Sequence, residues 1–447
     1  MQSAGQTDFL SSSTGPNIWV VEIGEPVPRP GEPARTMRAG LIAKMLRARG
    51  VNVTWFVSTY SHARKEPVVP PGTEEMSEDG VRLVYLHGRD YQSNVSLNRM
   101  INHWQVAQDF RTKANKLPRP DVIYCCYPTI DLAHATTSFG KANGVPVIVD
   151  IRDMWPDVLV DAAPVPKPLG KLLISPLRWR ASAALGQATN IVATSEVFLN
   201  RGLEIARRER RAGDGEMLLA YQPPARDKSA LAAARQRWID RGLTFEGEEK
   251  IACMFCNISD VPILPHAIAA LEHLPERSAR NLKMVICGTG TRFNWFRSEA
   301  ENHPQLMAPG QVNAEDIFAL MQEAKCGLLF YPRRDDFRSA FPNKVGEYLA
   351  GSLPIFSTVD GRVGDLLHDQ DCGVVTSDTD PSTLAHDLDA LIWNDDRLQR
   401  QSDNAARIYS ECFSAGSVYG AFCDHLMELA GASNAQIPGP GRQAFTR

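Results

Sequence analysis

Short apolar segments that alternate with helix-like stretches constrain the fold of this chain more than any other feature of its sequence. The first, over 18–23, leads through a loop rich in Gly and Pro and a helical stretch over about 33–49 to another apolar segment at 51–57. This order is typical of a parallel sheet, in which a helix returns the chain to the start of the next strand. Further segments of the same kind lie at 81–86, 122–126, 145–150 and 190–194. We predict one doubly wound α/β domain over 18–222.

A second series of strands and helices begins at 251–255, after a charged, alanine-rich stretch over 205–250 that we interpret as a linker with a peripheral helix. Since 447 residues exceed what one hydrophobic core usually holds, we assign this series to a second doubly wound domain over 223–415. Its later strands are predicted at 282–287, 327–330, 353–356 and 373–375. A last helix is predicted over 416–431. Residues 1–17 and 432–447, which are rich in Gly and polar residues, are expected to be loose tails.

The composition excludes several classes of function. A formal net charge of −4 gives no general attraction to nucleic acid, and no run of about 20 apolar residues could span a bilayer. Nine cysteines without regular spacing do not indicate a disulfide framework. Cys253 and Cys256 form a CxxC pair inside an apparent strand, with no second pair of metal ligands. We therefore expect a cytoplasmic protein that uses no metal.

The stretch from Ser339 to Gly351 combines a helix start and a short helix, and a strand follows it. Pro342 suits the first turn of a helix, where free backbone N–H groups and the helix dipole attract an anion. Lys344 adds a cation to this turn, and Glu347 lies one turn further along the same face. A cation at the helix start with a carboxylate behind it suits a nucleotide diphosphate. The cation would face the phosphates, and the carboxylate can accept hydrogen bonds from the ribose hydroxyls. The alternative is a solvated Lys–Glu pair on the surface.

A second distinctive stretch ends a buried strand with Asp150, Arg152 and Asp153. The carboxyl ends of the strands are where an α/β domain places its ligands. Charged groups are costly to bury unpaired, so these three side chains are expected either to pair or to face the site. An ion pair that only fixes the loop is the structural alternative.

The stretch from Pro342 resembles the nucleotide-sugar motif P-S/N-K-x-x-E-Y-L/M-A-x-G of the family 4 glycosyltransferases, in particular of the branch that builds bacterial surface polysaccharides. The resemblance implies that four residues bind the donor: Pro342, Asn343, Lys344 and Glu347. Glu347 would hold the ribose, and Lys344 would lie beside the diphosphate. Many members carry an earlier Glu, whose position Ser339 occupies here. The fold of the family is GT-B, in which two Rossmann-like domains face a cleft and the last helix crosses back to the first domain.

The stretch around Asp153 resembles the D/E-x-R-D-x-W-P signature of the same branch, which borders the reaction centre. Relatives outside the branch carry a His near here, and this chain has none in the stretch. The resemblance therefore leads us to predict that a carboxylate contacts the sugar or activates the acceptor hydroxyl. We name Asp153 first and Asp150 second, with Arg152 as the third member of this catalytic group.

Several loops resemble binding loops of the family. Gly31 ends a Pro-rich loop, and in relatives a Gly-rich loop at this place lies under the diphosphate. Arg38 resembles an Arg of the helix that follows this loop in relatives. A simple connector is the alternative for this loop. Cys256 replaces the usual Gly of a loop that includes Asn257, and no cation follows it. The remaining residues predicted at the donor are Gly288, Gly290, Gly310, Val312, Gly361 and Arg362.

The resemblance covers most of the chain and implies a retaining enzyme of the hexosyl- or N-acetylhexosaminyl-transferase type. It implies a nucleotide-sugar donor, expected to be UDP-linked, and a lipid-linked or growing glycan as acceptor. The sequence Asp378-Thr379-Asp380 looks like a metal-binding DxD, but it lies in a polar loop before a helix and is interpreted as a turn. A basic amphipathic stretch over 164–185 suits either the inner face of the cytoplasmic membrane or an ordinary domain helix.

Three other functions stand beside this one. A noncatalytic nucleotide-sugar or glycan-binding protein on a degenerate GT-B frame is favoured by Ser339 and by the missing cation after Asn257. A GT-B sugar-nucleotide epimerase shares the fold, but the signature around Asp153 is not typical of it. An NAD dehydrogenase is disfavoured, because no G-x-G-x-x-G follows the first strand.

Overall fold

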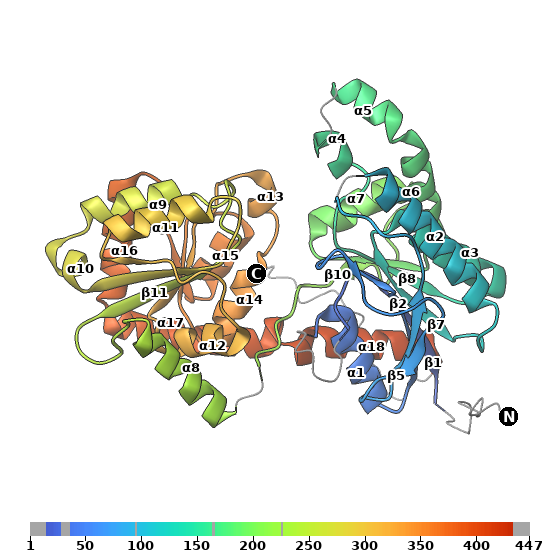
Figure 1. The fold of residues 1–447 in the computed structure, drawn as a ribbon, viewed down its shortest axis with the longest axis horizontal. Helices are drawn as coiled ribbons and strands as arrows, with labels where there is room; N and C mark the ends of the chain where they lie inside the picture. Colours follow the sequence, from blue (N-terminus) through green and yellow to red (C-terminus); the bar gives the residue numbers. More distant parts are fainter. Residues whose placement is uncertain (1–14, 28–35, 94–95, 163–165, 225–226, 432–447) are drawn as a thin grey trace. The chain divides into compact units, whose positions relative to one another are not determined.

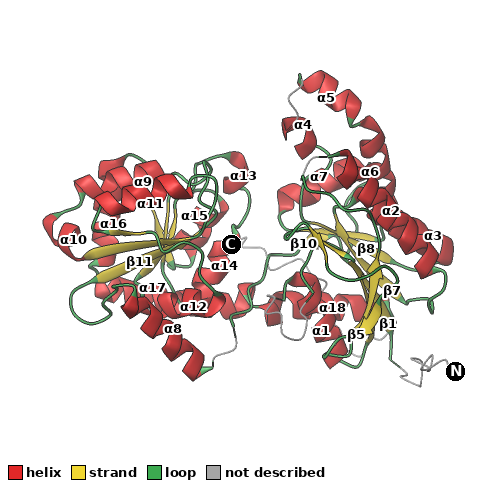
Figure 2. Cartoon of the chain, viewed as in Figure 1, coloured by secondary structure: helices red, strands yellow, loops and turns green. Residues whose placement is uncertain are grey.

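The structure, a computed structural model, describes residues 15–27, 36–93, 96–162, 166–224 and 227–431. The chain folds into two compact units. One extends to Met217 and takes up the chain again at Tyr419, and the other runs from Leu218 to Val418. Each unit consists of a sheet with helices on both faces (Figure 1; Figure 2).

The first unit contains an eight-stranded sheet in the order β10-β9-β8-β7-β1-β2-β6-β5. Neighbouring strands are parallel except at one edge, where β5 runs antiparallel to β6. A short antiparallel pair, β3 with β4, lies outside this sheet. The strands are β1 Asn17–Val21, β2 Asn52–Ser58, β3 Tyr60–Ser61, β4 Glu66–Pro67, β5 Glu74–Met76, β6 Arg82–Leu86, β7 Val122–Tyr127, β8 Val147–Ile151, β9 Asn190–Ala193 and β10 Gly215–Glu216.

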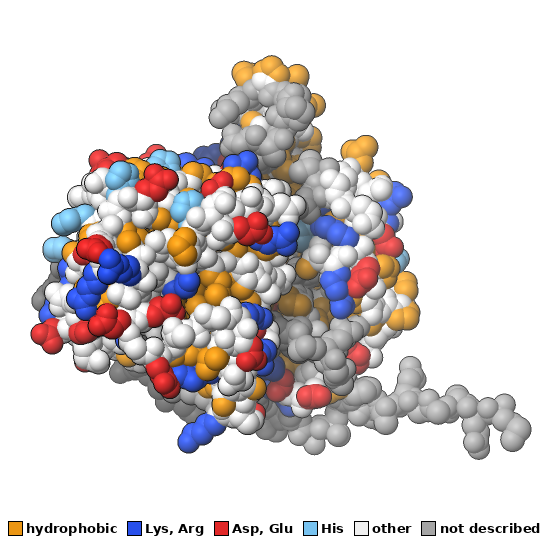
Figure 3. Space-filling view, turned by 60° about the vertical axis from the view of Figure 1, so that its left-hand side comes forward, with side chains coloured by type: hydrophobic (Ala, Val, Ile, Leu, Met, Phe, Trp, Pro, Cys, Tyr) orange, Lys and Arg blue, Asp and Glu red, His pale blue; other side chains and the backbone are white. Residues whose placement is uncertain are grey.

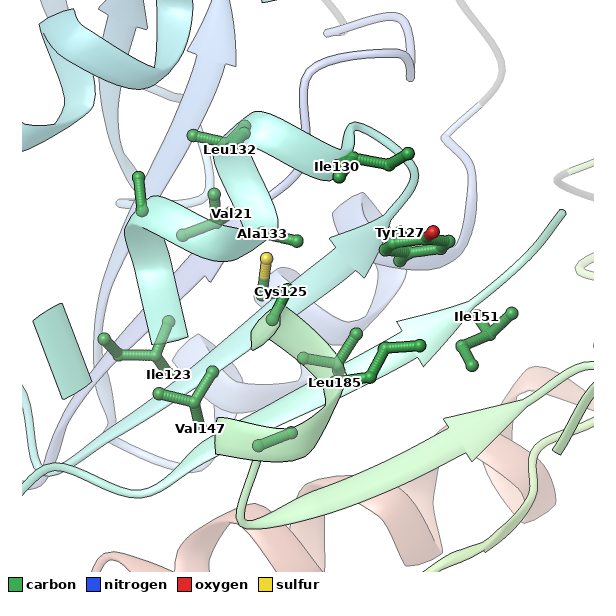
Figure 4. Close-up of a cluster of buried hydrophobic side chains, with 14 of the residues drawn as sticks. Val21, Ile123, Cys125, Tyr127, Ile130, Leu132, Ala133, Val147, Ile151 and Leu185 are labelled. Atoms are coloured by element: carbon green, nitrogen blue, oxygen red, sulfur yellow. The ribbon is translucent and has the colours of Figure 1, made fainter. Parts of the chain in front are cut away.

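Strand β7 shows how both faces of this sheet are buried. Ile123 and Cys125 point into a cluster with Leu185 and other side chains of the helices on one face (Figure 4). Tyr124, which lies between them, contacts Phe422 on the opposite face, with ring centroids 5.0 Å apart. A strand buried on both faces is expected to be largely apolar, as this one is. The helices are α1 Arg38–Ala48, α2 Leu97–Ala114, α3 Ile130–Asn143, α4 Val158–Ala162, α5 Lys167–Leu173, α6 Ser175–Gln187 and α7 Glu196–Ala206.

The last helix, α18 (Ala415–Leu429), belongs to the first unit from Tyr419 onward. Arg49, the C-cap of α1, pairs with Asp424 at 2.7 Å and donates a second hydrogen bond to the carbonyl of Gly420. Because Phe422 and Asp424 face first-unit residues, the predicted return of the last helix to the first domain is confirmed.

The second unit contains a six-stranded parallel sheet in the order β13-β12-β11-β14-β15-β16. This is the Rossmann order, in which the direction of strand addition reverses after the third strand. The strands are β11 Lys250–Phe255, β12 Leu282–Cys287, β13 Leu306–Met307, β14 Cys326–Leu329, β15 Ile355–Ser357 and β16 Gly373–Val375. The helices are α8 Lys228–Asp240, α9 Leu264–Ala270, η1 Leu271–His273, α10 Glu276–Asn281, α11 Phe293–Asn302, α12 Ala314–Glu323, α13 Asp335–Arg338, α14 Asn343–Ala350, α15 Arg362–Asp369, α16 Pro381–Ile392, α17 Asp395–Ile408 and the π-helical turn η2 Tyr409–Phe413.

The linker predicted over 205–250 is wrong in its first part. Strand β10 pairs with β9 and completes the first sheet. The fully buried carboxylate of Asp214 holds this end of the chain, because it pairs with Arg208 and accepts from the backbone N–H of Ile191. The charges that suggested a solvated linker are therefore partly internal ion pairs. Strands of two or three residues such as β10 carry no readable periodicity.

Candidate functional site

A cavity of about 610 Å³ lies in the second unit, at the point where the strand order reverses between β11 and β14. Ligands of such sheets bind outside the carboxyl ends of the strands at this point, and the volume is that of a small-molecule site. The cavity unites several of the residues predicted at the donor: Asn257, Gly288, Val312, Pro342, Asn343 and Lys344. Its other lining residues are Phe255, Cys256, Cys287, Thr289, Gln311, Ile317 and Tyr331.

Helix α14 brings the most polar pair to this cavity. Pro342 is its N-cap, and no side chain caps the first turn. Lys344 lines the cavity, and its Nζ lies 3.0 Å from Oε2 of Glu347. Glu347 is only 4% exposed, which excludes the alternative of a solvated surface pair. The buried carboxylate of Glu347 is thus paired with a half-buried lysine, and this ion pair lies at the wall of the cavity, where it can interact with a ligand.

The core fixes the direction of α14. Val345, Tyr348 and Leu349 are fully buried, and the hydroxyl of Tyr348 donates to the carbonyl of Leu328 in β14. Because these three side chains face the core, Lys344 on the other side of the helix faces the cavity.

Gly288 and Gly290 shape the loop after β12. Their φ angles are +141° and +156°, which side chains disfavour. A Cβ at Gly288 would lie 1.8 Å from the carbonyl oxygen of Cys256, and one at Gly290 would lie 2.3 Å from Oδ1 of Asn257. The two glycines thus let the two loops meet. Gly288 also donates to the carbonyl of Gly310, which ties in the turn before Val312.

Gly361 and Arg362 do not line the cavity but lie next to the segment that enters α14. The guanidinium of Arg362 stacks over the ring of Phe341 at 4.6 Å. Ser339, at the position of the family's earlier Glu, donates through Oγ to the carbonyl of Asp335 at 2.6 Å and closes the turn of α13.

In the first unit, Asp150 and Arg38 form one buried ion pair. Nη1 of Arg38 lies 2.9 Å from both carboxylate oxygens, and Tyr124 and Arg152 donate to Oδ2. Burial would raise the pKa of Asp150, but Arg38 and Arg152 hold it below its ordinary value. Asp150 is completely buried with both oxygens occupied, so its geometry favours the structural alternative over the predicted catalytic role.

Sequence reasoning missed Glu25 and Glu22. The Glu25 carboxylate accepts from the backbone N–H of Ala39 at the start of α1 and pairs with Nη1 of Arg152. Glu22 accepts from the N–H groups of Gly24 and Glu25, and its burial, together with the charge of Glu25, raises its pKa to about 7. The sequence signal that could have identified them is the pair of carboxylates, Glu22 and Glu25, on either side of Gly24 just after the first strand.

Asp153 is the most exposed of the three charged residues in its stretch. Its Oδ1 accepts from the N–H of Met154 at 2.7 Å. Nearby, the guanidinium of Arg99 lies over Trp155 at 4.9 Å, and burial and Arg99 lower the pKa of His103 to about 3. This basic aromatic cluster was not predicted. Gly31, the remaining predicted residue, lies outside the described residues.

Comparisons with known proteins identify the family of both units. Residues 36–212 match the model of the glycosyl transferase 4-like domain, and residues 236–408 match that of glycosyl transferases group 1. No curated protein sequence matches the chain. Within the described residues, no helix has the length and hydropathy to cross a bilayer, and no cluster of side chains suits a metal ion.

Three solved structures share the fold. Sucrose-phosphate synthase from Thermosynechococcus elongatus has a TM-score of 0.65 at 13% identity, with 94% of this chain and 100% of that one covered. HepE from Anabaena in complex with UDP has a TM-score of 0.58 at 13% identity, covering 92% and 100%. WaaG, a glycosyltransferase involved in lipopolysaccharide biosynthesis, has a TM-score of 0.58 at 14% identity, covering 92% and 99%. Because the two family models together match most of the chain, it belongs to the family 4-type glycosyltransferases, and the solved structures show that it has their GT-B fold.

Proposed function

We propose that this glycosyltransferase moves a hexosyl or N-acetylhexosaminyl group from a UDP-sugar to a lipid-linked or glycan acceptor of a bacterial surface polysaccharide, with retention of anomeric configuration. The observation that carries the proposal is the cavity at the reversal point of the second sheet, with Lys344 on its wall and Glu347 directly behind. Support for UDP comes from HepE, which was solved with UDP and with UDP-glucose. Support for the acceptor class comes from WaaG, which is involved in lipopolysaccharide biosynthesis.

The residues of the cavity can stabilise a departing diphosphate. Negative charge develops on the diphosphate as the glycosidic bond breaks, and a cation with free N–H groups at a helix start offsets it without a metal. Lys344 and the first turn of α14 supply these groups. Glu347 accepts from ribose hydroxyls when Lys344 turns from it toward phosphate. For Asp153 we propose contact with the sugar or the acceptor hydroxyl.

Calorimetric titration with UDP, GDP and ADP tests the donor site. We expect the wild-type protein to bind UDP best, and Lys344→Ala and Glu347→Ala each to weaken binding at least tenfold. The control is Glu276→Ala with Arg280→Ala, which removes a pair on α10 in which both side chains are more than 70% exposed. No binding of any nucleotide by the wild type would overturn the proposal.

A noncatalytic binding protein remains the second candidate, because Ser339 only closes a turn and supplies no carboxylate at the position of the family's earlier Glu. Assays of UDP-sugar hydrolysis or of sugar transfer distinguish a glycosyltransferase from a noncatalytic binding protein. A protein that binds UDP and a UDP-sugar but releases no UDP with any lipid-linked or glycan acceptor would favour this candidate.

A further inference from the structure

A cluster of basic and aromatic side chains lies at the carboxyl edge of the first sheet. Strands β2, β6 and β8 run in the same direction, so the segments that follow them leave the sheet at one edge (Figure 1). This edge is where α/β sheets bind ligands. The basic aromatic cluster, as we call it, consists of His62, Lys65, Tyr91, Arg99, His103 and Trp155.

Two cations of the cluster lie against one aromatic ring. Nζ of Lys65 is 5.1 Å from the centre of the Tyr91 ring, and Cζ of Arg99 is 5.9 Å from it. Both cationic side chains are half-buried and still reach solvent. Burial and the charge of Arg99 lower the pKa of Lys65, as expected of two cations that repel each other. Folding gains nothing from this repulsion, whereas a bound anion would offset it.

The positive charge of the cluster lies beside Asp153. The charge of Asp153 acts on Arg99 and opposes the lowering of its pKa that burial causes. Glu66, in the same turn as Lys65, pairs with Arg64 at 3.0 Å. The face of the second unit in Figure 3 shows a more ordinary arrangement, in which positive and negative side chains are interspersed. The cluster therefore concentrates cations next to the carboxylate that we propose at the reacting sugar or hydroxyl.

The two histidines of the cluster are neutral at pH 7. Nζ of Lys65 donates to Nδ1 of His62 at 3.1 Å, so this ring nitrogen carries no proton. Burial and the charges of Arg99 and Lys65 lower the pKa of His62 to about 4. Burial and the charge of Arg99 lower the pKa of His103 to about 3. At neutral pH the positive charge thus rests on Lys65 and Arg99, and the imidazoles serve as hydrogen-bonding groups.

Contacts around the cluster hold both cations in place. Tyr60 packs on Tyr91 with ring centroids 4.7 Å apart, and its hydroxyl donates to the carbonyl of Tyr91. Asn102 of α2 donates to the carbonyl of Arg89 at 2.8 Å, which joins the start of α2 to the loop after β6. Lys65 has a φ of +59°, a conformation that residues with a side chain rarely adopt. Side chains held in this way lose little conformational entropy when a ligand binds.

We propose that the basic aromatic cluster binds an anionic group of the acceptor, a phosphate or a carboxylate carried by the sugar that receives the transferred group or by its neighbour. The planar guanidinium of Arg99 can donate to two oxygens of such a group, and Lys65 adds a point charge. Asp153 would contact the reacting end of the same acceptor. Only the assignment of the anion to the acceptor rests on the proposed function.

Calorimetric titration of the full chain with glucose 6-phosphate, glucuronic acid and glucose tests the site. We expect at least one charged sugar to bind tenfold or more tightly than glucose, and this preference to fall at high salt because the charges are screened. The charged sugar that binds more tightly tells whether the site takes a phosphate or a carboxylate.

Variants assign the preference to the cluster. Lys65→Gln with Arg99→Gln should abolish it, and Arg99→Lys, which keeps the charge, should retain part of it. The control is Arg64→Gln, which removes a neighbouring cation whose side chain is 50% exposed and should leave the preference unchanged. Circular dichroism shows whether each variant is folded. If the double variant does not fold, the single variants Lys65→Gln and Arg99→Gln should each lower the preference.

Equal binding of charged and neutral sugars by the wild type, or an undiminished preference in the glutamine variants, would overturn the inference. Lys344→Ala should keep the preference for the charged sugar, and its loss there would place the anion in the donor cavity instead. UDP titration keeps the two proposals apart, because UDP affinity should not change in Lys65→Gln with Arg99→Gln. A wild type that prefers the charged sugar but binds no UDP would refute the proposed function and leave the anion site in place.

Discussion

Arg38 and Asp150, which are 112 residues apart in the chain, form a buried ion pair with two hydrogen bonds of 2.9 Å from a single guanidinium nitrogen. Each residue was predicted at a site, Arg38 near phosphate and Asp150 near the reaction centre. Their pairing favours a structural task for both. Arg38 also donates to the carbonyl of Met217 at the end of the first unit, so the pair joins α1, β8 and the last residue before the second unit.

Asp150→Asn is expected to lower the free energy of unfolding by about 3–5 kcal/mol, because it leaves the guanidinium of Arg38 buried without its counter-charge. Denaturant titration followed by circular dichroism measures this change. Arg38→Met with Asp150→Leu removes both members of the pair and should recover part of the stability, since Tyr124 and Arg152 still lose their acceptor. An Asp150→Asn protein of wild-type stability that has lost all transfer activity would instead make Asp150 catalytic.

Asp153→Asn is expected to lower activity without changing stability. The side chain is exposed, so stability should change by less than about 0.5 kcal/mol. If Asp153 contacts the reacting sugar or acceptor, kcat should fall about 100-fold or more while UDP affinity stays the same. Asp396→Asn, an exposed carboxylate in the first turn of α17, is the control for loss of charge. Unchanged kcat in Asp153→Asn would remove it from the reaction centre.

The donor motif could be predicted because its information is local. A proline before a helix and a Lys and a Glu three residues apart define a cap and a face by spacing alone, and the structure shows Lys344 on the cavity wall with Glu347 behind it. The positions of most strands along the chain followed from the same local periodicity.

The ion pairs could not be predicted, because spacing says nothing about partners far along the chain. The ion pair between Arg152 and Glu25 and the hydrogen bond from the N–H of Ile191 to Asp214 depend on how the strands are arranged in the sheet. For the same reason the sequence left two interpretations of 164–185 open, a membrane-facing stretch and an ordinary domain helix, and only the fold shows that Leu172 and Leu173 are exposed.

Gly290→Ala is expected to weaken UDP binding at least tenfold and to destabilise the second unit by about 2–4 kcal/mol. The new Cβ would meet Asn257 and Ile258 at 2.3 Å, so the two loops must separate and the cavity changes shape. Calorimetry and denaturant titration measure the two effects. Gly416→Ala is the matched control, since its nearest neighbour would lie 3.8 Å away. Equal UDP affinity in both variants would contradict the role given to the loop.

The buried carboxylate of Glu22 should make the stability of the first unit depend on pH. Its pKa is raised from 4.5 to about 7 in the folded protein, so between these pH values the folded state binds more protons than the unfolded state. Stability from this group is therefore fully present below pH 4.5 and is lost as pH rises through 7, by about 3 kcal/mol at most. Glu22→Gln should flatten this dependence and raise stability at pH 8, whereas Glu78→Gln, an exposed carboxylate of the same unit, should not. Denaturant midpoints at pH 5, 6, 7 and 8 measure the effect, and parallel curves for the wild type and Glu22→Gln would show that Glu22 keeps an ordinary pKa.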